Sequence, residues 1–135
     1  MEAVPKEVRV LVVDDDQHIR EALVEVLELE GFKPLVAENG QRGLELLRAE
    51  KPDVVLLDLM MPVMNGWEFR QIQVGDPLVA DIPVVVMTAH IGGADGIDGV
   101  SFIKKPMEIE DLVDTIKRAI EPEEVDEPLG LEVQM

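Results

Sequence analysis

Residues 9–17, RVLVVDDDQ, run from a row of apolar side chains straight into three consecutive aspartates. The apolar row predicts a β-strand, and the aspartates follow at its carboxyl end. Neighbouring carboxylates repel one another, most strongly where water is partly excluded. A chain that places them side by side needs a compensating partner at this point.

Apolar residues recur at helical spacing directly after this stretch. They share one face of a predicted helix: Ile19, Ala22, Leu23, Val26 and Leu27. Gly31 then closes the segment, as is common at a helix end. The first unit of the chain is therefore predicted to be a strand followed by an amphipathic helix.

The same alternation continues along the chain. The further predicted strands are PLVAEN (34–39), DVVLLD (53–58), IPVVVMT (82–88) and VSFI (100–103). The further predicted helices are GQRGLELLRAEK (40–51), GWEFRQIQV (66–74) and a last helix with Ile109, Leu112, Val113, Ile116 and Ile120 on one face. Runs such as DVVLLD are apolar on both faces, as in a strand between two helix layers. We therefore expect an α/β fold with a doubly wound, five-stranded parallel sheet and right-handed crossovers.

Length and composition fit one globular domain. The 135 residues are 47% hydrophobic, which is enough for a core, and the absence of cysteine excludes disulfides and thiolate metal sites. Twelve basic against 29 acidic residues give a net charge of −17, which disfavours binding to nucleic acid and to anionic membranes. The N-terminus has no basic segment followed by a long apolar run, so we expect a cytoplasmic protein that binds neither DNA nor membranes directly.

Polar residues follow four of the predicted strands. They are Asp14 and Asp15, Asp58, Thr88, and Lys104 and Lys105 before Pro106. Because the carboxyl ends of parallel strands form one rim, these side chains are expected to converge there. A single aspartate after a strand is most often a turn residue or a helix N-cap, and this interpretation is preferred for Asp16.

A carboxylate cluster becomes favourable when it holds a hard divalent cation, and Mg²⁺ binds a few oxygen ligands while keeping several waters. One carboxylate can then be a nucleophile toward phosphorus, as in aspartyl-phosphate chemistry. A hydroxyl and an ammonium supply the donors and the charge that a transferring phosphoryl group needs. The set at this rim therefore indicates phosphoryl transfer assisted by Mg²⁺.

The motifs VLVVDDD, VVLLDLMMPVMNGWEF, IPVVVMTA and FIKKP, in this order, resemble the response regulator receiver domain of two-component signalling. The resemblance covers residues 7–120, preceded by an N-terminal extension (1–6) and followed by an acidic tail (121–135) that is predicted to be flexible. It implies strand order 2-1-3-4-5. It also implies a signalling phosphoacceptor, not an enzyme, that assists its own phosphorylation and dephosphorylation with Mg²⁺. Its partners would be a sensor histidine kinase or phosphotransfer protein and a downstream protein target.

The resemblance also assigns roles to individual residues. Asp58 is the expected phosphoacceptor, and the expected metal site consists of Asp14, Asp15, Asp58 and the backbone carbonyl of Met60. Thr88 and Lys105 would each contact a phosphoryl oxygen, with Lys104 as the alternative if the register slips by one residue. The family's Lys-Pro bond is usually cis, which proline makes accessible. Phe102 is assigned as the switch aromatic, or else it is an ordinary half-buried strand residue. Met60 and His90, two positions after Asp58 and Thr88, are expected to flank the phosphoryl group and to affect the access of attacking water, or else to be loop residues with no kinetic role.

One segment departs from the family pattern. Residues 89–104, AHIGGADGIDGVSFIK, are short for a loop, a complete helix and a strand, and they contain four glycines. Each glycine inside a helix costs about 1 kcal/mol relative to alanine. The fourth helix is therefore expected to be truncated or missing, and residues 90–99 to form a mobile loop. Partner recognition would then depend mainly on the last helix and the rim around Phe102.

Two other functional classes stay open at this point. An aspartyl-phosphate phosphatase or mutase would need an Asp-x-Asp nucleophile pattern after the first strand and a substrate cap. Residues 14–16 contain the pattern trivially, but the chain has no insertion large enough for a cap. An unphosphorylated protein-interaction module of the same fold usually lacks one of the acidic or lysine positions, and none is lost here. The phosphoacceptor switch is thus the preferred function.

Overall fold

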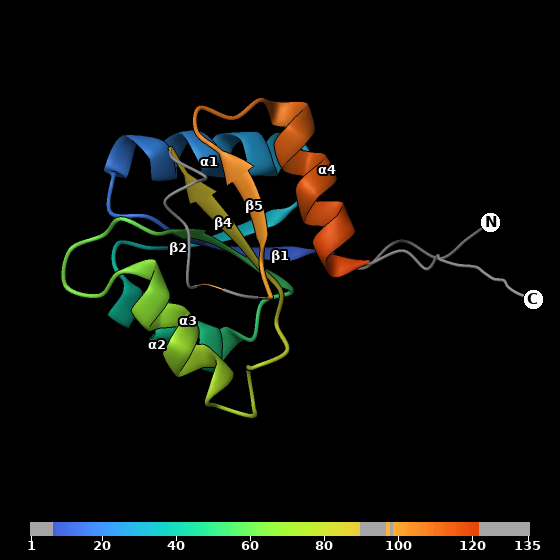
Figure 1. Ribbon diagram of the computed structural model, residues 1–135. Helices are drawn as coiled ribbons and strands as arrows, with labels where there is room; N and C mark the ends of the chain where they lie inside the picture. Colours follow the sequence, from blue (N-terminus) through green and yellow to red (C-terminus); the bar gives the residue numbers. More distant parts are fainter. Residues whose placement is uncertain (1–6, 90–96, 98, 122–135) are drawn as a thin grey trace, which may run out of the picture.

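Strands and helices alternate along most of the chain in the structure, a computed structural model that describes residues 7–89, 97 and 99–121 (Figure 1). The strands are β1 (Arg9–Val13), β2 (Lys33–Ala37), β3 (Val54–Asp58), β4 (Val84–Thr88) and β5 (Ser101–Lys104). The helices are α1 (Gln17–Leu29), α2 (Gly40–Glu50), α3 (Gly66–Val74) and α4 (Ile109–Ile120). These elements lie within a few residues of those predicted from the sequence.

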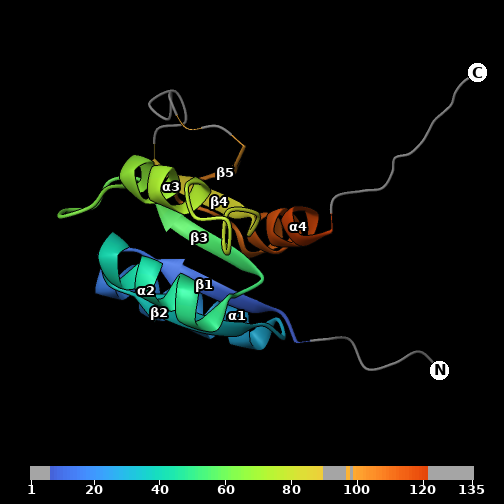
Figure 2. The same ribbon diagram turned by 90° about the horizontal axis from the view of Figure 1, so that it is seen from below.

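All five strands are parallel and form one sheet in the order β2-β1-β3-β4-β5. Helices α1 and α4 cover one face, and α2 and α3 cover the other, nearer the viewer in Figure 2. The central strands β3 and β4 are buried along their whole length, which explains why their sequences are apolar on both faces. The predicted doubly wound architecture and strand order are confirmed.

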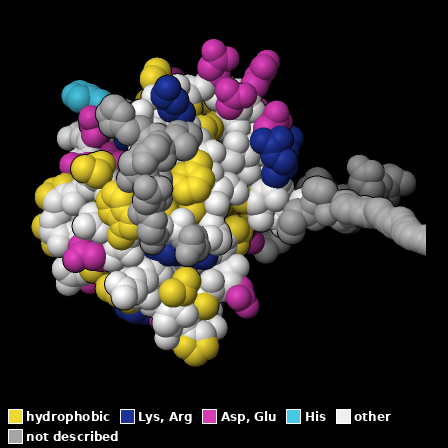
Figure 3. Space-filling model, viewed as in Figure 1, with side chains coloured by type: hydrophobic (Ala, Val, Ile, Leu, Met, Phe, Trp, Pro, Cys, Tyr) yellow, Lys and Arg dark blue, Asp and Glu magenta, His cyan; other side chains and the backbone are white. Residues whose placement is uncertain are grey.

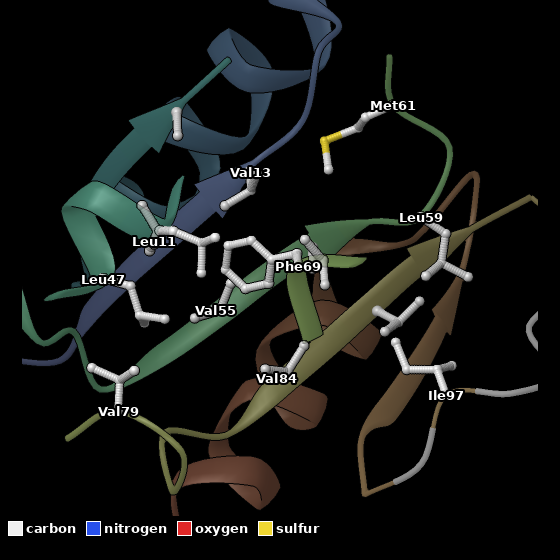
Figure 4. Close-up of a cluster of buried hydrophobic side chains, with 14 residues drawn as sticks. Leu11, Val13, Leu47, Val55, Leu59, Met61, Phe69, Val79, Val84 and Ile97 are labelled. Atoms are coloured by element: carbon white, nitrogen blue, oxygen red, sulfur yellow. The ribbon is translucent and has the colours of Figure 1, made fainter. Parts of the chain in front are cut away.

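The face covered by α2 and α3 has a core built around Phe69 of α3, which is completely buried (Figure 4). Gly43 lets α2 approach this ring closely, because a Cβ there would lie 3.1 Å from Phe69 Cε2 and 2.9 Å from Val13 Cγ2. Met61 and Met87 are both buried, Met61 in this core and Met87 in the core on the opposite face. The sheet is therefore packed against buried side chains on both faces beneath its rim.

The N-termini of α1, α2 and α3 are capped by side chains from the preceding loops, whereas α4 has no side-chain cap. Asp16 Oδ1 accepts hydrogen bonds from the backbone N–H of His18 (2.9 Å) and Ile19 (3.2 Å), which confirms its predicted N-cap role. Asn65 and Glu68 form a capping box at the start of α3. Acidic side chains gather over the N-terminal end of α4 in the space-filling view, in keeping with two acidic residues in its first turn (Figure 3).

The connection from β4 to β5 contains no helix among its described residues. The order of elements therefore fits a truncated fourth helix, as the short, glycine-containing sequence predicts. Ile97 is buried in the core on the α2 and α3 side, and the carbonyl of Gly99 accepts a hydrogen bond from Arg70 Nη2 at 3.1 Å. His90 lies outside the described residues. So do most of the residues that are expected to form a mobile loop, namely 90–96 and 98.

Residues 1–6 and 122–135, the predicted extension and most of the predicted tail, also lie outside the described part of the chain. Within the described ranges, no helix combines the length and the apolar character needed to cross a membrane.

Candidate functional site

Three carboxylates meet where β1 and β3 end. The two strands are hydrogen-bonded neighbours in which Val13 pairs with Leu57, so the next residues, Asp14 and Asp58, emerge side by side. One carboxylate oxygen from each of Asp14, Asp15 and Asp58 lies within 4.8 Å of the others. Asp14 is completely buried and Asp58 is 6% exposed, whereas Asp15 is exposed. The predicted convergence of these residues at the rim is therefore observed.

An ammonium group lies beside the two buried carboxylates. Lys105 Nζ is 3.1 Å from Asp14 Oδ2 and 3.6 Å from Asp58 Oδ1. The Lys105–Pro106 peptide bond is cis. Lys104 is instead the last residue of β5 and is exposed. The structure thus places Lys105, and not the alternative Lys104, at the acidic cluster.

Backbone groups fix the orientation of both buried carboxylates. The N–H of Asp16 donates to Asp14 Oδ1 at 2.9 Å, and the N–H of Met60 donates to Asp58 Oδ1 at 3.2 Å. On the far side of the β1–α1 turn, Arg20 Nη1 donates to the carbonyl oxygen of Asp14 at 2.8 Å. The acidic side chains are therefore held by the loops that carry them as well as by Lys105.

The electrostatic environment raises the pKa of Asp58 from 3.8 to about 6. Burial is the largest cause, followed by repulsion from Asp14, with a smaller contribution from Asp15. Attraction to Lys105 and the Met60 N–H hydrogen bond act in the opposite direction. Asp58 is therefore mostly ionised at neutral pH, but only at a cost in free energy that a bound cation would reduce.

The remaining predicted residues surround this cluster. Thr88 is 5% exposed at the end of β4, the strand next to Asp58, and its carbonyl accepts the N–H of Lys105 at 2.8 Å. Met60 is 71% exposed beyond the end of β3. Phe102 is 36% exposed on β5, two positions from Lys104.

The donor set fits Mg²⁺. The candidate ligands are carboxylate oxygens, which hard divalent cations prefer, and they lie at the ends of β1 and β3, close enough to share one ion. The exposed Asp15 leaves the cluster open to water on one side, as an ion that keeps several waters requires. A cation at this point would also relieve the repulsion between Asp14 and Asp58.

Residues 10–117 match the family model of the response regulator receiver domain. The chain belongs to this family. A receiver domain accounts for the parallel sheet and for the acidic cluster at its rim, which fits the family's metal site.

Several curated relatives are also response regulators or related proteins. Response regulator MprA of Mycolicibacterium vanbaalenii is 36% identical over 113 residues, which are 78% of this chain and 47% of MprA. The phosphate regulon transcriptional regulatory protein PhoB of Klebsiella pneumoniae is 36% identical over 92% of this chain and 58% of PhoB. The chain thus spans about half the length of these relatives. Protein PilH of Pseudomonas aeruginosa is 36% identical over 83% of this chain and 97% of PilH.

Solved receiver structures have the same architecture. The chemotaxis protein CheY4 of Vibrio cholerae superposes with a TM-score of 0.79 at 25% identity, covering 84% of this chain and 99% of CheY4. The N-terminal domain of a response regulator receiver protein from Methanoculleus marisnigri gives a TM-score of 0.68 at 36% identity, over 85% of this chain and 98% of that domain.

Two contributions to the site were missed by sequence reasoning. Arg20 was not singled out, although it follows the N-cap Asp16 by four residues, one helical turn, so that its long side chain can return to the rim. The second contribution is that of Gly66, the first residue of α3, where the need for glycine is steric. A Cβ there would lie 2.8 Å from the Cα of Leu59 and 3.1 Å from the carbonyl oxygen of Asp58.

Proposed function

We propose that this receiver domain is a phosphorylation-dependent switch in which Asp58 is the phosphoacceptor. The donor is a phosphohistidine of a sensor kinase or of a phosphotransfer protein. The observation that carries the proposal is the ammonium of Lys105 lying between a buried, ionisable Asp58 and the fully buried Asp14. This arrangement combines a nucleophile with a positive charge beside it, as phosphoryl transfer requires.

In the proposed reaction an oxygen of the ionised Asp58 carboxylate attacks phosphorus. The bond from phosphorus to the imidazole nitrogen of the donor breaks, and the imidazole leaves with the electron pair and takes up a proton. The product is an acyl phosphate on Asp58. Water later attacks the phosphorus, which regenerates the carboxylate and releases inorganic phosphate.

Asp14, Asp15, Asp58 and the backbone carbonyl of Met60 are the residues proposed to hold Mg²⁺. When bound, the ion supplies positive charge that neutralises the phosphoryl oxygens during transfer. Asp14 would act largely through bound water. Its burial and its hydrogen bonds to Lys105 and to the Asp16 N–H support a role in orientation.

Lys105 and Thr88 are proposed to bind the phosphoryl oxygens once the acyl phosphate has formed. Lys105 Nζ is already 3.6 Å from Asp58 Oδ1 and needs to move little to contact a group attached there. The hydroxyl of Thr88 belongs to a buried residue at the end of the neighbouring strand. Movement of Thr88 toward the phosphoryl group would free space for Phe102, whose side chain is partly exposed on β5, to change rotamer.

The output is proposed to be altered binding of a downstream protein. The net charge of −17 disfavours direct contact of this chain with DNA phosphates. Surfaces near Phe102 and along α4 are the proposed contact region. We also propose the division into a short extension (1–6), the receiver domain (7–120) and an acidic tail (121–135).

Intact-mass measurement after incubation with acetyl phosphate and Mg²⁺ tests the proposal. The expected result is a gain of one phosphoryl group by the wild-type protein and no gain by Asp58→Asn or in the presence of EDTA. Continuous hydrolysis of acetyl phosphate without any protein adduct would instead indicate an enzyme. Neither adduct nor hydrolysis would indicate an unphosphorylated interaction module.

A further inference from the structure

Arg20 is a charged residue at the rim to which the proposed chemistry gives no role. It lies on α1, is half-buried, and donates from Nη1 to the carbonyl oxygen of Asp14 at 2.8 Å. Its guanidinium therefore reaches back over the first turn of its own helix to the end of β1. Arg20 is therefore a half-buried arginine next to an acidic cluster whose hydrogen bond goes to a backbone carbonyl and not to a carboxylate.

The position of the Asp15 carboxylate depends on the backbone. Within the described residues, the Asp15 carboxylate takes part in no hydrogen bond or ion pair, whereas Asp14 is held by Lys105 and by the Asp16 N–H. Asp15 is also exposed, so packing does not restrain it. What directs its side chain toward Asp58 is the orientation of the peptide that joins it to Asp14.

Arg20 holds that peptide. The carbonyl oxygen that it binds belongs to the peptide unit between Asp14 and Asp15, and the preceding N–H, that of Asp14, donates to the carbonyl of Ala37 at 3.2 Å. The backbone is thus fixed on both sides of the Asp14 Cα, by β2 through Ala37 and by α1 through Arg20.

We propose that Arg20 is a positioning residue that orients Asp15 for Mg²⁺ by fixing the Asp14–Asp15 peptide. This inference rests on the proposed function, because it assumes that the cluster binds the cation. Arg20 can influence the affinity for Mg²⁺ in two ways, which change that affinity in opposite directions. Its positive charge repels a cation, so loss of the charge alone would tighten binding. Loss of the positioning contact would weaken binding.

The test is a titration of the protein with MgCl₂, followed by the amide NMR signal of Asp15. Arg20→Met removes the charge and the hydrogen-bond donors while keeping an unbranched side chain of similar length. Arg20→Lys keeps the charge and one donor group. Arg42→Met is the matched control. Arg42 is an exposed arginine of α2 that pairs with Glu45. We expect Arg20→Met to raise the Kd for Mg²⁺ by about tenfold, the lower end of the range for groups that orient metal ligands. Arg20→Lys should restore most of the affinity, and Arg42→Met should leave it unchanged.

The possible results separate this inference from the proposed function. If the wild-type protein does not bind Mg²⁺, the proposed function itself fails. If the wild-type protein binds Mg²⁺ and Arg20→Met binds it equally well or more tightly, the positioning role of Arg20 is wrong. A loss of thermal stability without a change in Kd would likewise show a structural role only. If Arg20→Met does not fold, Arg20→Gln, which is too short to reach the carbonyl, takes its place in the same comparison.

Discussion

Replacing Asp58 with asparagine should make the metal-free protein more stable at neutral pH. The raised pKa of Asp58 means that its ionised form is disfavoured in the folded protein relative to the unfolded chain. Asparagine keeps the shape of the side chain and can still accept the N–H of Met60, but it carries no charge. It therefore removes the repulsion from Asp14 and the cost of burying a charge.

The magnitude follows from the difference between the two pKa values. A folded-state pKa of about 6 against 3.8 corresponds to about 3 kcal/mol at about 1.4 kcal/mol per pH unit. Because the cluster opens to water at the rim, solvent screening reduces this value, and we expect a gain of about 1–2 kcal/mol. The contribution of Asp58 to stability is fully present below pH 3.8 and is lost as the pH rises through about 6. The advantage of Asp58→Asn should thus be complete above pH 7 and shrink toward zero near pH 4.

Urea unfolding in EDTA, followed by the fluorescence of the single tryptophan, Trp67, measures this difference. The control is Asp81→Asn, which removes one negative charge from an exposed position away from the cluster. Added Mg²⁺ should narrow the gap by stabilising the wild-type protein. Equal stability of wild type and Asp58→Asn at pH 7.5, or a gain that does not change between pH 4.5 and 7.5, would show that the ionised Asp58 does not destabilise the folded protein.

Three further substitutions probe the site. Asp15→Asn should raise the Kd for Mg²⁺ by about tenfold or more in a calorimetric titration, because even an exposed unit charge next to a divalent cation contributes at least about 1–2 kcal/mol. An unchanged Kd would mean that the metal site is misplaced. Lys105→Ala should impair the phosphorylation-dependent shift of amide NMR signals more than Lys104→Ala, because only Lys105 contacts the buried carboxylates; equal effects would contradict this assignment. Gly66→Ala should lower the free energy of urea unfolding by about 1–3 kcal/mol, because the added methyl group meets the backbone of Leu59, and an unchanged value would show that the loop adapts freely.

The sequence predicts the fold well because the decisive signals are periodic. The central strands β3 and β4 are short and apolar on both faces, and the helices between the strands are amphipathic, so the layers follow directly from burial. The Asp16 cap could also be predicted, since an aspartate directly before a helical pattern can accept hydrogen bonds from the first backbone N–H groups of that helix. The strands, the amphipathic helices and this cap each depend on residues that lie close together in the sequence.

The parts of the site that could not be predicted depend on contacts in space. The family resemblance favours Lys105 over Lys104, but the residue pattern alone leaves both open, and the structure decides between them by where β5 ends relative to the rim. The hydrogen bond of Arg20 to the Asp14 carbonyl depends on a side-chain rotamer, which no periodicity reports. Likewise, the need for glycine at position 66 comes from the close approach of α3 to Leu59.

The most direct test of the central claim is the location of the phosphoryl group. After reaction with acetyl phosphate and Mg²⁺, borohydride reduces an aspartyl phosphate to homoserine, and tandem mass spectrometry of the peptides then identifies the converted residue. We expect homoserine at position 58 and unchanged aspartate at positions 14 and 15. Conversion at Asp14 or Asp15, or a phosphorylated protein in which Asp58 stays intact, would show that Asp58 is not the phosphoacceptor.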